Sequence, residues 1–457
     1  MNALWTSAEI ATATHGTAST GFAVNGVAFD SREVGPGDLF IALKGETTDG
    51  HRFVDGAFEQ GAAGAIVSQP VAHPNVQVAD TTAALDALGV AARARTAAKI
   101  AGVTGSVGKT GTKEALSAAL ARGKRGAVHR SVKSYNNHTG VPLSLSRMPA
   151  DSAFGVFEMG MNHAGELAAL TRLVRPHVAL VTTVVAAHIE YFGTVEAIAD
   201  AKGEIFQGLE PGGTAIVPFD NPHRDRLIGH AKPYAANIVT FGTSDGADVR
   251  ALDAVQVAGG TMVTAKLKDA ELSFTLSQPG DHWVSNAMAV LAAVQALGGD
   301  LAAAGLALAD FGGLAGRGAQ HRIRVGDGEA VLIDESYNAN PTSMAATLKV
   351  LGATDADRRI AVLGAMRELG EKSDELHASL VDPILAAGVD YALLVGSGIE
   401  PLAKALEGRV ETAHWPDASQ AGESLAKLIR PGDAILIKGS NAIGLGRIVA
   451  ALTGGQS

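Results

Sequence analysis

Residues 101–116 read AGVTGSVGKTGTKEAL, and this stretch decides how the rest of the chain is interpreted. Glycines at 105 and 108 followed by Lys109 and Thr110 are typical of a loop that binds phosphate. The common form of that loop, G-x-x-x-x-G-K-[ST], would have a glycine at position 103, where this chain has Val103. The run KIAGVTG before the loop predicts a strand, and KEALSAALARG after it predicts a helix. Phosphate capture needs this order, because backbone N–H groups at a helix N-terminus point at the anion.

We therefore predict that a nucleotide binds at this loop. Lys109 would reach the β- and γ-phosphates of the nucleotide, and the Thr110 hydroxyl would bind Mg²⁺. The backbone cradle comprises Gly105, Ser106, Val107 and Gly108. The alternative interpretation is an ordinary corner between a strand and a helix.

The composition narrows the class of protein. A chain of 457 residues is too long for one ordinary core, so we expect several domains. Apolar residues make up 47% and charged residues 18%, as in soluble globular proteins. No cysteine is present, which excludes disulfides and thiolate metal sites and suits the cytosol. The first residues lack the pattern of a signal peptide, and the apolar runs are too short to span a bilayer. A net charge of −10 argues against a general nucleic-acid binder. We expect a cytoplasmic monomer.

Strand-like and helix-like segments alternate along most of the chain. After residue 98, short apolar runs such as FGVFEMG and VALVTTVV alternate with helical stretches, which predicts a parallel, doubly wound sheet. The segment VRALDAVQVAGGTMVTAKLKDAELSFTL predicts antiparallel strands inserted before a helix. A second α/β system begins near residue 320, and the glycine-rich FGGLAGRGAQ before it is the best candidate hinge. We predict an α/β protein with three domains, 1–97, 98–312 and 313–457.

The shortened loop resembles that of the Mur ligase family, ATP-dependent amide-bond-forming enzymes of bacterial cell-wall synthesis. The resemblance continues, in the order of the family, through these blocks: SYNNHTGVPLSL (134–145), FEMGMNHAGEL (157–167), AAHIEYFGT (186–194), AKGEIFQGL (201–209), GDHWVSNAMA (280–289), LIDESYNANPTSM (332–344), LGAMRELG (363–370) and IKGSNAIGLG (437–446). It implies a small α/β uridine-nucleotide domain, a central P-loop parallel-sheet ATPase domain, and a C-terminal Rossmann-like α/β domain for the incoming amine.

Three residues of the central domain have both a purely structural and a functional interpretation. Glu158 ends a predicted strand, where a carboxylate would emerge at the carboxyl edge of a parallel sheet; it suits Mg²⁺ or a surface position equally well. His188 after an apolar strand is more often an ordinary core or loop histidine, and Lys202 in a helix is more often exposed. The resemblance implies that Glu158 and His188 ligate Mg²⁺. It further implies that Lys202 is carbamylated and contributes a carboxylate to the metal.

Three further residues are implied in ATP binding. The Asn286 amide can match the donor–acceptor edge of adenine, although this residue, Asp281 or Ser285 could instead cap a helix. Arg317, in the candidate hinge, would reach the phosphates when the third domain closes. Asp334 is similar to the family acid that contacts the ribose, and is otherwise a turn residue at the end of a strand.

The first domain narrows the family branch. Its segments DSREVGPGDLFIALKG and DGHRFVDGA look like the uridine-nucleotide domain of two branches. One of these, which adds a diamino acid, carries an Asn-Pro-Arg motif that is absent here. The blocks SYNANPTSM and LGAMRELG look like the branch that adds D-alanyl-D-alanine. The resemblance then implies that ATP and Mg²⁺ activate UDP-N-acetylmuramoyl-tripeptide as an acyl phosphate, which the amine of D-alanyl-D-alanine attacks.

Candidate contacts to these substrates are polar side chains in loops. Ser31, Arg32, Asn136 and Asn137 are candidates for the UDP-muramoyl peptide, and Tyr337, Asn338 and Asn340 for the dipeptide. Asparagines in loops also form turns, so the alternative interpretation is that these asparagines have a structural role only. Two positions depart from the family pattern: Ala365 replaces an acidic residue, and Asn441 replaces an arginine. Both lie in the domain that recognises the amine.

Three other functions remain as alternatives. A folate polyglutamylating or other amino-acid ligase would share the fold, but those relatives lack a first domain of the uridine type. A P-loop NTPase acting as a switch or motor would usually carry the strict loop that Val103 breaks. A non-catalytic binding protein would not need the complete set of Lys109, Thr110, Glu158, His188 and Lys202.

Overall fold

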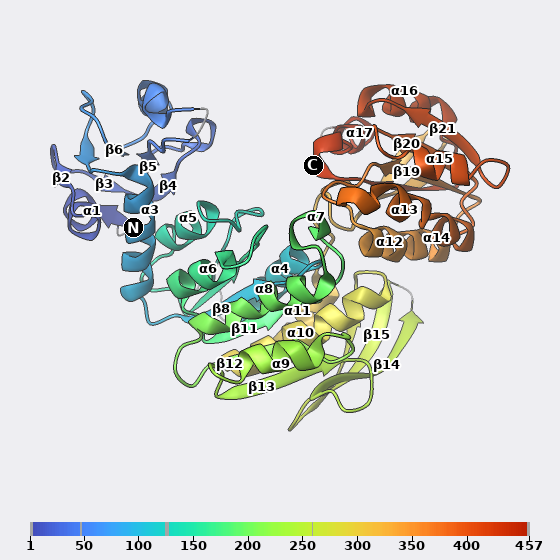
Figure 1. Cartoon of the computed structure of the whole chain (residues 1–457), viewed down its shortest axis with the longest axis horizontal. Coiled ribbons are helices and arrows are strands. Elements are labelled where there is room, and N and C mark those ends of the chain that lie inside the picture. The colour runs from blue at the N-terminus through green and yellow to red at the C-terminus, as the bar shows by residue number, and fades with distance from the viewer. Residues whose placement is uncertain (1–2, 46–47, 124–127, 258, 455–457) are drawn as a thin grey trace.

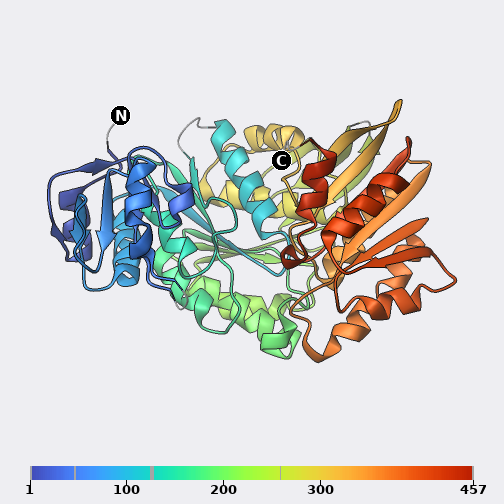
Figure 2. The same ribbon diagram turned by 90° about the horizontal axis from the view of Figure 1, so that it is seen from above.

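The computed structural model describes residues 3–45, 48–123, 128–257 and 259–454. Within them the strands form a five-stranded, a nine-stranded and a six-stranded sheet, together with a two-stranded ribbon. The three larger sheets follow one another along the chain. Figure 1 shows the first and last of them at two ends of the central one, and Figure 2 shows the same succession from above. The α/β class with three domains is confirmed.

The first domain is a small α/β unit in which the sheet order is β2-β7-β6-β5-β4. Neighbouring strands of this sheet are parallel except β2 and β7, and β1 and β3 form a separate antiparallel ribbon. Its elements are β1 (Trp5–Thr6), α1 (Ser7–Thr14), β2 (Thr17–Ala18), β3 (Ala23–Val24), β4 (Gly26–Ala28), the 3-10 turn η1 (Ser31–Glu33), β5 (Asp38–Ile41), the 3-10 turn η2 (Gly50–Phe53), α2 (Val54–Glu59), β6 (Gly64–Val67), β7 (Asn75–Gln77) and α3 (Thr81–Ala94).

The central sheet has the order β16-β15-β14-β13-β12-β11-β8-β10-β9. Its strands are β8 (Lys99–Thr104), β9 (Val128–Arg130), β10 (Phe154–Glu158), β11 (Val178–Val181), β12 (Thr214–Pro218), β13 (Asn237–Gly242), β14 (Val249–Val257), β15 (Gly260–Lys266) and β16 (Glu271–Leu276). Its helices are α4 (Lys109–Gly123), α5 (Gly140–Ser146), α6 (Glu166–Val174), α7 (Ile189–Phe192), α8 (Val195–Gly203), the 3-10 turn η3 (Glu204–Gly208), α9 (Arg224–Ala231), α10 (Asp281–Leu297) and α11 (Leu301–Asp310). The predicted antiparallel insertion is confirmed, since β14, β15 and β16 pair antiparallel.

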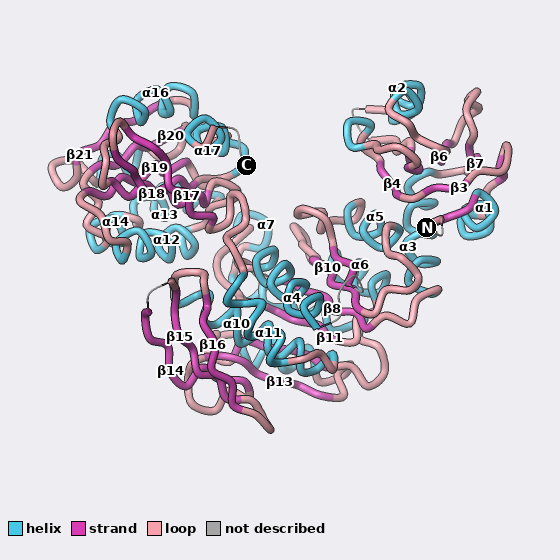
Figure 3. Tube along the Cα trace, turned by 180° about the vertical axis from the view of Figure 1, so that it is seen from behind, coloured by secondary structure: helices cyan, strands magenta, loops and turns pink. Residues whose placement is uncertain are grey.

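Helices cover both faces of the parallel part of this sheet, which explains its uninterrupted apolar strands. In β11, Val178 and Leu180 pack into one core with α4, α10 and α11, whereas Ala179 and Val181 pack into the opposite core. Figure 3 shows α4, α10 and α11 together on one side of the sheet. The strand β8 lies between β10 and β11, so the loop that follows it emerges at the carboxyl edge of the sheet with a strand on each side.

The third domain has the sheet order β17-β18-β22-β19-β20-β21, parallel except for β17. Its elements are β17 (Ala319–Val325), β18 (Gly328–Glu335), α12 (Pro341–Ala353), β19 (Arg358–Gly364), the 3-10 turn η4 (Gly370–Lys372), α13 (Ser373–Ala378), α14 (Val381–Ala386), β20 (Tyr391–Val395), α15 (Glu400–Ala405), β21 (Glu411–Trp415), α16 (Ala418–Leu428), β22 (Asp433–Lys438), the 3-10 turn η5 (Asn441–Ile443) and α17 (Gly446–Leu452). The candidate hinge lies between α11 and β17. No helix in the described ranges is long and apolar enough to cross a bilayer.

Candidate active site

The loop between β8 and α4 is held in a shape that only glycine permits. Gly105 and Gly108 have φ of 150° and 85°, in the region that side chains disfavour. A Cβ at Gly105 would overlap the Thr182 hydroxyl. That hydroxyl donates to the Val107 carbonyl at 2.6 Å, and the Ser106 hydroxyl donates to the Val185 carbonyl at 3.0 Å. Two side-chain hydrogen bonds within the central domain therefore support the shape of the cradle.

Lys109 brings a positive charge to this cradle. Its Nζ donates to the Gly105 carbonyl at 2.7 Å, and burial lowers the pKa of its ammonium. Lys109 lines a cavity of about 260 Å³ together with Arg317, which approaches from the hinge. Two cations on one buried cavity make a strong site for an anion such as phosphate.

Glu158 is a buried carboxylate held by neutral donors. It lies at the end of β10 and is 1% exposed. The Thr110 hydroxyl donates to its Oε2 at 2.8 Å, and the Asn136 amide donates to its Oε1 at 2.7 Å. A carboxylate next to a hydroxyl at the edge of a phosphate loop is the donor set that Mg²⁺ uses, because this ion takes few protein oxygens and completes its shell with water and phosphate.

His188 and Lys202 line the same cavity as Glu158. His188 has a left-handed backbone, with φ of 60°, and its Nδ1 lies 2.5 Å from Oε2 of Glu368 in the third domain. Lys202 lies in α8 as predicted, but it is only 2% exposed, which contradicts the interpretation as a surface lysine. Burial, with a smaller effect from Lys109, lowers the pKa of Lys202 well below its usual value.

These residues fit a magnesium site in which a bound phosphate group supplies the remaining donor atoms. The described part of the chain has no group of three or more His, Asp and Glu side chains arranged to hold a metal. Glu158, Thr110 and His188 supply oxygen and nitrogen donors, and a neutral Lys202 amine can react with dissolved CO₂ to give another oxygen donor. A metal held here would therefore depend on phosphate oxygens for the rest of its shell.

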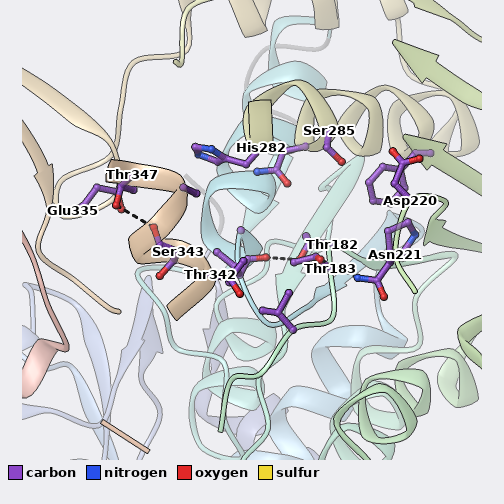
Figure 4. Close-up of a pocket in the computed structure, with 17 residues that line it drawn as sticks. Thr182, Thr183, Asp220, Asn221, His282, Ser285, Glu335, Thr342, Ser343 and Thr347 are labelled. Carbon is purple, nitrogen blue, oxygen red and sulfur yellow. Dashed lines mark hydrogen bonds between the residues drawn. The ribbon is translucent and has the colours of Figure 1, made fainter. Parts of the chain in front are cut away.

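A second cavity of about 290 Å³ adjoins the phosphate loop and suits the base of a nucleotide. Asn286 lines it from the second turn of α10. The helix-cap interpretation is wrong for this residue and for Asp281 and Ser285, because Gly280 is the N-cap and no side chain caps the helix. Asn221 contributes an amide from the other side, as Figure 4 shows, and donates to the Val184 carbonyl at 2.9 Å.

The third domain closes both cavities. Figure 4 shows Thr342 and Ser343 of α12 directed into the base cavity, across from Asn221. In the phosphate cavity, Arg317 donates to the Ser134 hydroxyl at 2.8 Å and lies over the Tyr337 ring, 3.9 Å from its centroid. Because these walls come from different domains, a nucleotide bound here would contact both at once.

The predicted dipeptide residues Tyr337, Asn338 and Asn340 also line the phosphate cavity. Asn340 has a local role as well, since its Oδ1 accepts from the Ser343 N–H and caps α12. The two departures from the family pattern lie at the same end of the third sheet: Ala365 directly follows β19, and Asn441 opens η5 after β22.

Other predicted residues lie elsewhere. Asp334 does not line either cavity; its carboxylate accepts from the Gly316 N–H at 2.6 Å and from the Ser336 hydroxyl at 2.6 Å. Asn137 shapes its own loop by accepting from the N–H groups of Thr139 and Gly140. Ser31 and Arg32 lie on η1 of the first domain, away from both cavities.

Several residues that line the cavities were missed by the sequence analysis. Lys438, at the end of β22, is 2% exposed and donates to the Asn338 carbonyl at 2.9 Å. Burial lowers its pKa. It follows an apolar strand just as Glu158 does, so the same signal could have identified it. His282 and Glu335 line both cavities, and burial lowers the pKa of His282. The sequence pattern indicated their neighbours Asp281 and Asp334 instead.

The family models that match this chain and the relatives named below agree with one another. Residues 23–123 match the catalytic domain of the Mur ligase family, residues 103–294 the Mur ligase middle domain, and residues 321–441 the glutamate ligase domain of Mur ligases. The chain is 35% identical to UDP-N-acetylmuramoyl-tripeptide–D-alanyl-D-alanine ligase of Escherichia coli K12, over 94% of both chains. The enzyme of the same name from Synechocystis is 35% identical, over 94% of this chain and 92% of its own.

Solved structures agree. A crystal structure of MurF from Acinetobacter baumannii superposes with a TM-score of 0.85 at 32% identity, covering 98% of this chain and 99% of that one. MurF ligase from Thermotoga maritima in complex with ADP gives a TM-score of 0.77 at 28% identity, covering 94% and 98%. Folylpolyglutamate synthase of Mycobacterium tuberculosis, at 18% identity and a TM-score of 0.64, shares the fold.

Proposed function

The chain belongs to the Mur ligase family, and from this we propose that it is the ATP-dependent ligase that joins D-alanyl-D-alanine to UDP-N-acetylmuramoyl-tripeptide. The observation that carries the proposal is the convergence of Lys109, Arg317 and the Glu158–Thr110 pair on one cavity beside a pocket sized for a base. The products are the UDP-linked pentapeptide, ADP and phosphate. The curated relatives match this chain from the first domain to the third, which favours this acceptor over that of a folate ligase.

In the first step, a carboxylate oxygen of the tripeptide attacks the γ-phosphorus of ATP. The bond from that phosphorus to the β,γ-bridging oxygen breaks, which leaves ADP and an acyl phosphate. Lys109 and Arg317 offset the negative charge on the transferred phosphoryl group. Glu158, Thr110, His188 and carbamylated Lys202 would hold Mg²⁺, which supplies further neutralisation of phosphate charge when bound.

In the second step, the neutral amine of D-alanyl-D-alanine attacks the acyl carbon. The C–O bond to phosphate breaks, the amide forms, and the amine nitrogen loses a proton to solvent or to the departing phosphate. Tyr337, Asn338 and Asn340 are proposed to orient the dipeptide from the third domain. Closure of that domain excludes water, which would otherwise hydrolyse the acyl phosphate.

The ATP contacts follow from the loop and the base cavity. Residues 105–110 hold the phosphates and Asn286 meets the adenine. Asp334 is retained as the candidate for the ribose, with its present hydrogen bonds to Gly316 and Ser336 exchanged on binding. In the first domain, Ser31 and Arg32 are proposed to hold the UDP-muramoyl end, with Asn136 and Asn137 nearer the reacting peptide.

We assign these roles to domains 1–97, 98–312 and 313–457. We propose a monomer as the active unit. We place the reaction in the cytoplasm, where ATP is supplied.

A phosphate-release assay tests the proposal. The purified protein is given ATP, Mg²⁺ and UDP-muramoyl tripeptide, with D-alanyl-D-alanine, a diamino acid or glutamate as acceptor. We expect release with D-alanyl-D-alanine alone and a product of the mass of the new amide. Release with another acceptor would overturn the substrate, and no release that depends on an acceptor would overturn the ligase.

A further inference from the structure

One short segment of the central domain contacts both other domains and the magnesium carboxylate. It comprises residues 131–136, between β9 and α5, and we call it the junction segment. Its Asn136 donates to Glu158, and its Ser134 accepts from Arg317 of the hinge. On its other side, Lys133 and Tyr135 both donate to Oε1 of Glu33 in the first domain, at 2.5 and 2.8 Å. A shift of this segment would therefore disturb the hydrogen bonds to Glu158, Arg317 and Glu33.

The junction segment is tied firmly to the phosphate-loop helix. Lys113 of α4 is fully buried, and its Nζ donates to the Ser131 carbonyl at 2.8 Å and the Lys133 carbonyl at 2.9 Å. The Gly160 N–H donates to the Asn136 carbonyl at 2.8 Å. These bonds leave the segment little freedom to absorb a displacement locally, so movement of one end is passed to the other.

The first-domain end of the segment has two contacts of different strength. Lys133 is 63% exposed, so its ion pair with Glu33 contributes little. Tyr135 is better shielded and also packs against Phe29, with ring centroids 5.9 Å apart. The Tyr135–Glu33 hydrogen bond is therefore the contact through which the first domain acts on the segment.

Glu33 is well placed to respond to a ligand of the first domain. It ends η1, the same turn that carries Ser31 and Arg32, the proposed contacts to the UDP-muramoyl end. Asp30 caps this turn by accepting from the Arg32 N–H at 3.0 Å. A ligand bound to Ser31 or Arg32 would contact the turn that carries the Glu33 carboxylate.

Resting on the proposed function, we propose that Glu33 and Tyr135 are positioning residues that link the first domain to the nucleotide site. When the UDP-linked peptide occupies the first domain, the Tyr135–Glu33 hydrogen bond supports the junction segment from a further side, beside the bonds from Lys113 and Gly160. Asn136 then holds Glu158 in the orientation that the nucleotide and its metal need. ATP thus binds most tightly when the substrate to be phosphorylated is already present, which limits wasteful hydrolysis.

Calorimetry with a non-hydrolysable ATP analogue and Mg²⁺, with and without UDP-muramoyl tripeptide, tests the inference. For the unmodified protein we expect the peptide to tighten analogue binding about fivefold or more, a common size for coupling between sites. Tyr135→Phe keeps the ring against Phe29 but removes the hydroxyl, and Glu33→Gln keeps an acceptor but removes the charge. We expect Tyr135→Phe to reduce the effect to below about twofold and Glu33→Gln to reduce it less.

Two further readouts separate positioning from direct binding. Each ligand alone should bind the variants within about twofold of the unmodified protein, and the double variant should lose no more coupling than Tyr135→Phe, since both changes affect one contact. At saturating peptide, the KM for ATP should rise by the factor of coupling lost, with kcat retained. Glu59→Ala and Tyr234→Phe, both at exposed positions, are the matched controls and should keep full coupling.

The outcomes are distinct. Full coupling in Tyr135→Phe, or independent binding of the two ligands to the unmodified protein, overturns the inference and leaves the proposed function standing. Loss of peptide binding by itself in Tyr135→Phe shows a direct ligand contact and also overturns it. If the unmodified protein binds neither ligand, the proposed function itself fails.

Discussion

Lys109 is the single residue on which phosphoryl transfer should depend most. In this structure its ammonium is held by the Gly105 carbonyl, so it is available to a phosphate that displaces that bond. We expect Lys109→Ala to lower kcat/KM by about 10²–10³-fold or more, the usual cost of removing a group that stabilises transition-state charge. Phosphate release measures this. Lys99→Ala, at an exposed position on the preceding strand, is the control, and near-normal activity of Lys109→Ala would refute the loop assignment.

Lys202 is buried and burial lowers its pKa, and this direction favours the neutral amine, the form that reacts with CO₂. We expect Lys202→Ala to lose at least about 10²-fold in kcat, because a donor to the charged site is lost. A small carboxylate such as acetate should restore part of the activity, since it replaces the carbamate charge. Lys202→Arg should stay inactive. Lys232→Ala, at an exposed site, is the control; full activity of Lys202→Ala without added carboxylate would contradict this role.

At the scale of the element, the loop between β8 and α4 depends on its glycines. We expect Gly105→Ala to raise the KM for ATP at least about tenfold, because φ of 150° and the overlap with Thr182 force the cradle out of shape. Gly229→Ala in α9 is the matched control, since a Cβ there meets nothing and alanine favours a helix. Initial-rate kinetics together with thermal unfolding separate the two effects. A Gly105→Ala enzyme with an unchanged KM would show that the cradle adapts.

At the scale of the whole molecule, polar contacts join the third domain to the central one, and the Arg317–Ser134 hydrogen bond is one of them. Glu368 bonds His188 at 2.5 Å, and its carbonyl accepts from the Glu190 N–H at 3.4 Å. Lys349 pairs with Asp281 at 2.5 Å, but both side chains are exposed. The Glu368–His188 pair is the more shielded of the two ion pairs, so it should contribute more to holding the domains together than the exposed Lys349–Asp281 pair.

Small-angle X-ray scattering of the ligand-free protein tests this ranking. We expect Glu368→Ala to increase the radius of gyration, with ATP analogue and Mg²⁺ reversing the change because the nucleotide contacts both domains. Lys349→Ala should leave the radius unchanged. The ranking is refuted if Lys349→Ala opens the molecule and Glu368→Ala does not.

Features that depend on neighbours in the sequence were predictable. The β8–α4 loop, the placement of Glu158 at the end of a strand and of Lys202 in a helix, and the antiparallel insertion are all borne out. Each follows from periodicity or turn chemistry within about ten to twenty residues. The helix-cap interpretation of Asn286 is wrong for a reason that is also local. The N-cap is the residue at which the backbone enters the helix, and in α10 that residue is Gly280.

The sequence by itself determined the α/β class, the nucleotide loop and the family, because the spacing of residues within short segments and the order of the motifs are enough to identify them. Only the tertiary structure decided that Lys202 and Lys113 are buried, that Glu368 meets His188, and that Asp334 binds its own hinge while Glu335 lines the cavities. Burial and pairing between residues far apart in the chain arise when sheets and domains pack together. That packing depends on the free energy of the whole molecule, so it cannot be predicted from any short stretch of the sequence.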